Sequence, residues 1–286
     1  MKLVKFAYNT GIHWGVLDKN NTTLHTDLSK TPALKDFNSV MDFFEGYPHA
    51  TQLPDLISLL DVTRLAPVLP TKNVLCIGKN YHDHILEFDG SAEDIEKIKE
   101  NPIFFSKAIS SIIATNTLIN PHTNITSQVD YEAELGVIIG KACLNVTEEE
   151  ALDYVYGYTC INDVTARDIQ KRHQQWMRGK SLDTHCPIGP CLVTADEIGD
   201  PQNLKIRSII NGDLRQDANT SLMMHSIAAQ ISVLSQGMTL NPGDIIATGT
   251  PKGVGMGFNP PKFLKPGDEV EIYIEKIGSL INIVGQ

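Results

Sequence analysis

The stretch Tyr131-Glu-Ala-Glu-Leu-Gly-Val-Ile-Ile-Gly140 combines two acidic residues with an apolar run. Its length and its β-branched residues predict a buried strand over 132–140. Side chains alternate between the faces of a strand, so Glu132 and Glu134 point to the same face. Two carboxylates so placed repel each other unless water or a cation separates them. For this pair alone a solvated strand face is favoured, and a site for Mg²⁺ or Mn²⁺ is the alternative.

Strand signals continue on both sides of this stretch, with a few helical patterns between them. Strands are expected over 73–78, 154–162, 192–195, 204–211, 244–248 and 269–277. Helices are expected over 81–99, 147–153, 164–175 and 221–234. The irregular spacing of the strands and the scarcity of helices argue against a Rossmann or TIM layout. The sequence therefore predicts a β-rich α+β fold, a roll or barrel with peripheral helices.

The start of the chain has a different pattern. Two short strands are expected within residues 2–18, around the turn-forming Asn9-Thr10-Gly11. Apolar residues recur at helical spacing over 38–62, which predicts one or two helices. The proline-bounded segment 64–70 has the composition of a boundary. We therefore expect a small N-terminal α+β domain over 1–66 and a larger domain over 70–286.

Composition narrows the choice of partners and compartment. The chain has 24 Lys and Arg against 34 Asp and Glu, a formal charge of -10, which argues against a nucleic-acid partner. An anionic substrate would need local cations from the protein or a metal. The five cysteines are scattered, as is typical of reduced, buried thiols. With neither a signal-peptide pattern nor a membrane-spanning apolar run, a cytoplasmic protein without a membrane partner is expected.

Several other residues are candidates for chemistry, each with an ordinary alternative. Asp163 ends an expected strand, where it could cap the following helix or complete a three-carboxylate metal site. His84 and Glu87 lie three apart on an expected helix, as a surface ion pair or as a general base held by a carboxylate. Lys180 lies in a segment rich in Gly and Pro, as a solvated charge or a contact for a substrate oxygen.

One more segment completes the set of candidates. The loop 248–255, Thr-Gly-Thr-Pro-Lys-Gly-Val-Gly, follows an expected strand. It lacks both the phosphate-binding and the dinucleotide-binding spacing of glycines. Such a loop can still present backbone N–H groups and a threonine hydroxyl to a carboxylate.

Five of these segments together resemble the motifs of the fumarylacetoacetate hydrolase family, in the family's order over residues 70–280. They are Gly-Lys-Asn-Tyr-x-Asp-His-x-x-Glu (78–87), Tyr-Glu-x-Glu-Leu (131–135), Asn-Asp-Val-Thr-Ala-Arg-Asp (162–168), Gly-Lys-Ser-Leu-Asp (179–183) and Thr-Gly-Thr-Pro-x-Gly-Val-Gly (248–255). The resemblance implies a catalytic domain built as a mixed β-sandwich roll, here over 70–286, and a homodimer. Residues 89–100, which are highly charged, are expected to form an exposed helix linked to the family's lid.

The resemblance also implies roles for individual residues. It implies Mg²⁺ or Mn²⁺ ligands at Glu132, Glu134 and Asp163, and catalytic residues at His84, Glu87 and Lys180. It implies substrate contacts at Arg167, Gln170, Thr250 and Lys107. Each of these assignments is an expectation for the structure to place.

The implied activity is divalent-metal-dependent cleavage of a C–C bond in a small 2-oxo acid. The reaction would be hydrolysis of an acylpyruvate, decarboxylation of oxaloacetate or both, by way of a pyruvate enolate stabilised by the metal and Lys180. One alternative is an isomerase, hydratase or decarboxylase of unsaturated dicarboxylic 2-oxo acids in aromatic catabolism. The other is a non-catalytic binding or scaffold protein. The scaffold serves several chemistries, so resemblance in fold does not choose between them.

Overall fold

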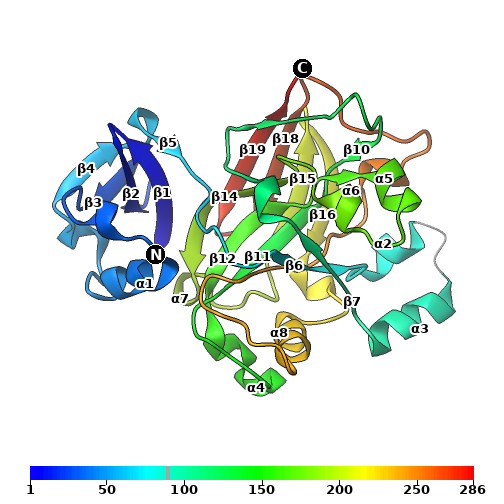
Figure 1. Ribbon diagram of the computed structural model, residues 1–286, viewed down its shortest axis with the longest axis horizontal. Helices are drawn as coiled ribbons and strands as arrows, with labels where there is room; N and C mark the ends of the chain where they lie inside the picture. The colour runs from blue at the N-terminus through cyan, green and yellow to red at the C-terminus, as the bar shows by residue number, and fades with distance from the viewer. Residues whose placement is uncertain (88–90) are drawn as a thin grey trace.

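The computed structural model describes residues 1–87 and 91–286, and its largest sheet runs through most of the molecule (Figure 1). Neighbouring strands in this sheet are, in order, β4 (Asp55–Ser58), β3 (Thr23–Thr26), β2 (Gly11–Leu17), β1 (Lys2–Tyr8), β14 (Cys186–Thr194), β12 (Val155–Asn162), β11 (Ala133–Ile139), β17 (Ile245–Ala247), β6 (Val74–Gly78) and β7 (Ile103–Lys107). The short strands β5 (Thr63–Arg64) and β8 (Ile112–Ile113) pair with β1 and β14.

A second sheet packs against the first. Its order is β16 (Asp213–Asn219), β15 (Lys205–Ile210), β18 (Glu269–Ile274), β19 (Gly278–Val284) and β9 (Leu118–Ile119). Strand β14 contacts β19, β12 contacts β18, and β11 contacts β15 across the two layers. Parallel pairs (β17 with β6, β14 with β8, β19 with β9) occur among antiparallel ones. The expected β-rich fold of mixed sheets is confirmed.

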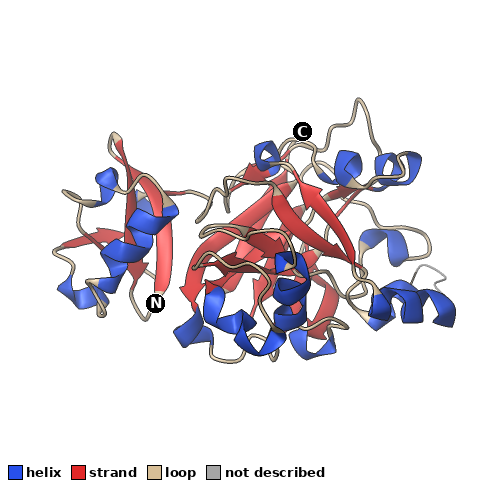
Figure 2. Cartoon of the chain, turned by 60° about the horizontal axis from the view of Figure 1, so that its bottom comes forward, coloured by secondary structure: helices blue, strands red, loops and turns tan. Residues whose placement is uncertain are grey.

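The helices are short and lie around the sheets (Figure 2). They are α1 (Phe37–Glu45), α2 (His82–Leu86), α3 (Ala92–Glu100), α4 (Glu148–Ala151), α5 (Arg167–Arg172), α6 (Met177–Lys180), α7 (Ala195–Ile198) and α8 (Ile227–Ser235). A small ladder joins β10 (Val129–Asp130) to β13 (Thr165–Ala166). No helix within the described ranges is both long and apolar enough to span a bilayer. All five cysteines are buried and unbonded, as expected.

Strand β11 forms from the acidic and apolar stretch at residues 131–140, and both of its faces are buried. Ala133, Leu135 and Val137 pack into the core between the two sheets. Glu134 and Ile138 point to the opposite face by alternation, and Ile138 joins a second apolar cluster there. A strand buried on both sides gives a continuous apolar run, which is the pattern that predicted it. The two glutamates at its start therefore enter the protein interior.

The N-terminal strands form a lobe at one side of the molecule (Figure 1). The hairpin β1–β2 turns at Asn9 and Thr10 as expected, and β1 also pairs with β14 of the larger part. The division into domains 1–66 and 70–286 stays a prediction. The second half of the expected 38–62 helix is wrong, because β4 lies there, with Leu56 65% and Ile57 6% exposed. A short apolar run fits both the helical and the strand repeat. This segment forms a strand because it pairs with β3.

Other expected helices are shorter than the pattern suggested. The 164–175 helix begins only at Arg167, because Thr165 and Ala166 pair with β10. The 81–99 helix is two helices, α2 and α3, and residues 88–90 lie outside the described residues. Strands β3, β7, β16 and β19 were not expected from the sequence. Each lacks a strong alternating pattern of its own and forms because a neighbouring strand supplies hydrogen bonds and an apolar face.

Candidate active site

Three buried carboxylates meet at the ends of β11 and β12. Glu132 directly precedes β11, Glu134 lies on it, and Asp163 directly follows β12. The backbone N–H of Asp163 donates to the carbonyl of Glu132 at 2.9 Å, which brings the strand ends together. One oxygen from each carboxylate lies within 4.8 Å of the others. We call these three residues the carboxylate cluster.

The burial of the cluster decides between the alternatives that the sequence left open. Glu132, Glu134 and Asp163 are 4%, 1% and 0% exposed. The solvated strand face favoured for the glutamate pair is therefore wrong. Asp163 does not cap the next helix, since Ala166 occupies the N-cap position of α5. A charged group so deep in the protein needs a partner, because desolvation of an unpaired carboxylate costs several kcal/mol.

Three basic side chains supply most of that compensation. Lys180 Nζ lies 2.6 Å from Glu132 Oε2 and 2.7 Å from Asp163 Oδ2. Arg167 Nη1 lies 2.7 Å from Glu132 Oε1. Both basic residues are buried, so the structure excludes the solvated alternative for Lys180. Their closeness holds Glu132 ionised: burial acts to raise the pKa of its carboxyl, but Lys180 and Arg167 outweigh it and bring that pKa to about 2.

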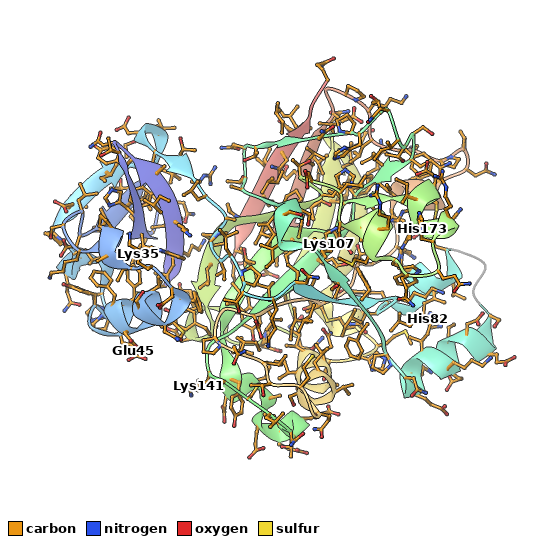
Figure 3. All side chains as sticks on the ribbon, viewed as in Figure 1. Lys35, Glu45, His82, Lys107, Lys141 and His173 are labelled. Carbon is orange, nitrogen blue, oxygen red and sulfur yellow. The ribbon has the colours of Figure 1, made fainter. Side chains whose placement is uncertain are left out.

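Lys107 is the third basic residue, and it contacts the carboxylate cluster through Asp163. Its ammonium lies 2.6 Å from Asp163 Oδ1 and donates to the carbonyl oxygens of Val164 and Lys180. Figure 3 shows Lys107 in the middle of the larger part of the molecule. It is absent from the residues that line the neighbouring cavity within the described chain. A direct substrate contact for Lys107 stays a prediction, and the geometry favours a role in holding Asp163 and the Lys180 backbone.

Together with Asp130, the cluster has one carboxylate more than the basic side chains around it can pair with, an arrangement that fits a divalent cation. Among the described residues Glu134 has no ion pair, and its Oε2 accepts only from the Gly249 N–H at 2.9 Å. Burial, then the nearby Asp163 and Glu132 carboxylates, raise the pKa of Glu134. Counting Asp130 (below), four buried carboxylates face three buried cations: Asp130, Glu132, Glu134 and Asp163 against Lys107, Arg167 and Lys180. All-oxygen ligands of this charge suit Mg²⁺ or Mn²⁺.

The loop that follows β17 closes one side of the cluster. Gly249 has a φ of +94°, and a Cβ there would lie 2.6 Å from Cβ of Asn80. Only glycine can hold this conformation at such close approach, and it does so with its N–H aimed at Glu134. The next residue, Thr250, is buried and lines the cavity. The loop thus presents one backbone donor and one hydroxyl, as its composition suggested.

His84 and Glu87 lie on and just after α2 and form the expected pair. The distance from His84 Nδ1 to Glu87 Oε2 is 3.1 Å, and both side chains are mostly buried, so this is not a surface ion pair. Glu87 Oε1 also accepts from the Gly253 N–H at 2.8 Å, and Lys252 Nζ lies 2.7 Å from Asp83 Oδ2. We call His84 and Glu87 the dyad. The described part of the expected lid helix is α3, which is exposed apart from Ile95 and Ile98.

A cavity of about 280 Å³ brings the predicted residues together. Of the predicted set, it is lined by His84, Glu132, Glu134, Arg167, Gln170, Lys180 and Thr250. Phe105 and Trp176 add an aromatic wall, and Lys180 Nζ lies 5.1 Å from the Phe105 ring centroid. Lys79 and Lys171 add positive charge at the lining. Such a space suits a small, doubly anionic molecule with several oxygen acceptors.

Two buried residues of the site escaped the sequence analysis. Asp130 accepts from Arg167 Nε at 2.9 Å and from the backbone N–H groups of Gly255 and Met256, so it fixes the arginine against the loop. Gln216 on β16 bonds both to β11 and to the loop at Thr250. Asp130 directly precedes the Tyr-Glu-x-Glu motif, which is a usable signal. A strand glutamine gives none.

Comparisons with known proteins identify relatives of the chain. The family model "Fumarylacetoacetate (FAA) hydrolase C-terminal" matches residues 73–285. The chain is 49% identical over 231 residues to "Oxaloacetate tautomerase YisK" of Bacillus subtilis, covering 80% of this chain and 75% of that protein.

Solved structures with a similar fold include two proteins with related names. A fumarylacetoacetate hydrolase from Exiguobacterium antarcticum superposes with a TM-score of 0.85 at 40% identity, covering 100% of this chain and 99% of that one. A 2-hydroxyhepta-2,4-diene-1,7-dioate isomerase from Mycobacterium marinum has a TM-score of 0.79 at 36% identity, covering 100% and 98%. The names of these relatives thus include a tautomerase, a hydrolase and an isomerase.

Proposed function

Since the chain belongs to the fumarylacetoacetate hydrolase family, we propose that it moves a proton at C3 of a small 2-oxo dicarboxylic acid, with oxaloacetate as the substrate. The observation that carries the proposal is the position of the dyad. His84 lines the same cavity as the carboxylate cluster and Lys180. A group that can take and return a proton therefore lies beside groups that can hold an oxygen-rich anion.

The lining supports a dicarboxylate in particular. Arg167, Lys180, Lys79 and Lys171 line a cavity of about 280 Å³ together with the Thr250 hydroxyl. Asp130, Glu132 and Gln170 hold Arg167 at Nε and Nη1, and its buried Nη2, which has no partner among the described residues, is a preorganised donor for a substrate carboxylate. Oxaloacetate carries two carboxylates and a carbonyl on four carbons, so it offers an acceptor to each of these donors. The name of the Bacillus subtilis relative supports the same substrate.

The residues of the chain divide the work of tautomerisation. His84 removes a proton from C3, and Glu87, 3.1 Å from its Nδ1, holds the imidazole in place. Lys180 offsets the negative charge that forms on the 2-oxo oxygen. His84 then returns the proton to that oxygen, and the reverse sequence converts the enol to the keto form. No atom is gained or lost.

Glu132, Glu134 and Asp163 would hold a divalent cation, with Lys107 supporting Asp163 from the far side. Mg²⁺ or Mn²⁺ bound there would supply Lewis-acid polarisation of the 2-oxo group. All three carboxylates are buried, so little water competes for them. Their electrostatic attraction for a bound cation would therefore be stronger than at the surface.

C–C cleavage is the second candidate, and the likeness to a hydrolase structure at 40% identity favours it. Loss of CO₂ from C4 of oxaloacetate leaves a pyruvate enolate, whose charge Lys180 would offset and which His84 would protonate at C3. Hydrolysis of an acylpyruvate would instead use His84 to activate water against the distal carbonyl. An isomerase acting on unsaturated dicarboxylic 2-oxo acids remains the next alternative, supported by the Mycobacterium marinum structure. A non-catalytic binding role would leave the dyad without a task.

One set of assays separates these activities. Enol-oxaloacetate is mixed with the protein and Mg²⁺, Mn²⁺ or a chelator, and formation of the keto form is followed by coupling to malate dehydrogenase. Pyruvate release from oxaloacetate and from acetylpyruvate is followed in parallel with lactate dehydrogenase, and metal-only decay is subtracted. We expect metal-dependent keto formation to exceed pyruvate release. Pyruvate release at the higher rate would move the assignment to C–C cleavage, and inactivity in every assay would overturn both. The expected homodimer is tested separately by sedimentation.

A further inference from the structure

Gln216 is a buried residue whose side chain joins two parts of the site. It lies on β16, is fully buried, and uses its whole side-chain amide. Its Oε1 accepts from the Ala133 N–H, between Glu132 and Glu134, at 3.0 Å. Its Nε2 donates to Thr250 Oγ1 and to the Pro251 carbonyl oxygen, both at 2.7 Å. These contacts make it a bridge from β11 to the loop.

The neighbours fix which way the amide faces. The Ala133 N–H can only donate and the Pro251 carbonyl can only accept, so the oxygen must face the first and the nitrogen the second. The second amide proton then has to point at Thr250 Oγ1. That hydroxyl is therefore an acceptor toward Gln216 and cannot direct its own proton there.

The Thr250 proton has one remaining direction. Thr250 lines the cavity, and among the residues that the structure describes its Oγ1 has no bond partner beyond Gln216. A hydroxyl that accepts on one side is free to donate on the other. We propose that Gln216 is a positioning residue that locks the Thr250 hydroxyl as a hydrogen-bond donor into the cavity, where it selects an anionic acceptor oxygen, namely a carboxylate of the substrate. This inference rests on the proposed function and names how one substrate group is recognised.

Two isosteric substitutions test the donor and its lock. Thr250→Val removes the hydroxyl and keeps the shape. Gln216→Glu keeps the oxygen that accepts from the Ala133 N–H. A carboxyl buried there is protonated and has a single O–H, which donates to the Pro251 carbonyl oxygen. Thr250 must then donate to the new carboxyl oxygen, so its proton turns away from the cavity. Thr250→Ser, which keeps the hydroxyl, is the matched control.

The readout is binding of oxalate, an inert dianion, to the Mg²⁺-loaded protein. Trp176 lines the cavity, so its fluorescence in a Trp14→Phe background reports binding directly. Loss of one hydrogen bond to a charged group should weaken oxalate binding about tenfold in Thr250→Val and in Gln216→Glu. Thr250→Ser should stay within about threefold of the parent. Affinity for Mn²⁺, measured by calorimetry, should not change in any of the three, because the Ala133 contact is kept.

The double variant gives the decisive comparison. If Gln216 acts through the Thr250 hydroxyl, Thr250→Val combined with Gln216→Glu binds oxalate no more weakly than Thr250→Val alone. Losses that multiply, or a Gln216→Glu protein with the parent's affinity, overturn the inference. Should Gln216→Glu fail to fold, Gln216→Met replaces it in the oxalate cycle, without the Mn²⁺ comparison, because methionine removes the acceptor of the Ala133 N–H.

The two proposals fail separately. Oxalate binding does not depend on turnover, so a parent protein that binds oxalate through Thr250 but leaves oxaloacetate unchanged overturns the proposed function alone. A parent that converts oxaloacetate while its oxalate binding ignores Gln216 overturns the inference alone.

Discussion

The carboxylate cluster and the dyad line one cavity, but the chain holds them in different ways. Glu132, Glu134 and Asp163 lie at the ends of long paired strands and are buried among three basic side chains. His84 lies on a helix of 5 residues and Glu87 directly follows it, and their contacts with the rest of the protein include the Glu87–Gly253 bond and an exposed Lys252–Asp83 pair. The cluster is thus preorganised by the sheet, whereas the dyad is joined to it by a few contacts.

This difference suggests a division of labour. Binding of a cation and of an anionic substrate gains from rigid, desolvated charges, because they need no reorganisation when the ligand arrives. Proton transfer needs one group at the right place and tolerates local movement, as long as the base reaches its proton. Changes in the cluster should therefore alter binding and stability, and changes in the dyad should alter turnover alone.

The largest effect is expected from Glu134→Gln. Glu134 has no ion pair within the described chain, so removing its charge should leave the metal-free protein at least as stable as before. Loss of a ligand should weaken Mn²⁺ binding by about 100-fold or more and remove metal-dependent turnover. Calorimetric titration with Mn²⁺ and thermal unfolding measure the two quantities. Exposed Glu93→Gln is the control, and unaltered Mn²⁺ affinity in Glu134→Gln would remove Glu134 from the metal site.

The second effect tests the dyad. His84→Gln should lower kcat by about 10²–10⁴-fold, as for loss of a general base, while the affinities for Mn²⁺ and oxalate change less than about twofold. His82, two residues away on the same helix with its side chain 52% exposed, provides the matched control in His82→Gln (Figure 3). Stopped-flow assays and the binding titrations decide. A His84→Gln protein with weaker metal binding but normal kcat would reverse the division of labour.

The third effect tests how the cluster is supported. Lys107→Met leaves the buried Asp163 carboxylate without one of its two lysines and should cost about 3–5 kcal/mol in the free energy of unfolding. Denaturant unfolding with exposed Lys99→Met as control measures it. Saturating Mn²⁺ should recover part of the loss, since a bound cation stabilises the folded state. A loss below 1 kcal/mol, joined to a raised KM, would instead make Lys107 the substrate contact that the sequence suggested.

The same contrast explains how much was predictable. The resemblance to family motifs predicted the carboxylate cluster and the dyad, whereas strand alternation alone accounts only for the shared face of Glu132 and Glu134, and helical spacing only for the His84–Glu87 pair. The supporting contacts came from elsewhere: Lys107 and Gln216 reach the site from β7 and β16 through pairings that no local pattern encodes. The strand at 55–58 escaped for the same reason, since its partner β3 decided its conformation.

The smallest effect is a pH dependence of the free energy of unfolding. It arises from a buried histidine near Lys107, which supports the carboxylate cluster. His185, which directly precedes β14, is buried and donates from Nε2 to the Asn120 carbonyl, and within the described ranges its Nδ1 has no partner. Burial, then the nearby Lys107 charge, lowers its pKa to about 3, and His122 adds to this while the Asn120 bond opposes it.

Between pH 6.5 and 3 the unfolded chain therefore binds a proton at this position that the folded protein does not. The contribution of His185 to the free energy of unfolding is fully present above pH 6.5. It decreases as the pH falls, and the loss is about 2 kcal/mol at pH 5. Denaturant unfolding from pH 7.5 to 4.5 measures the slope, which His185→Gln should flatten and His82→Gln should leave unchanged. His185 is not among the described residues that line the cavity, so kcat at pH 7.5 should be the same in His185→Gln and His82→Gln. An equally steep slope in His185→Gln would place the acid sensitivity in other groups and weaken the separation between a part that sets stability and a part that sets turnover.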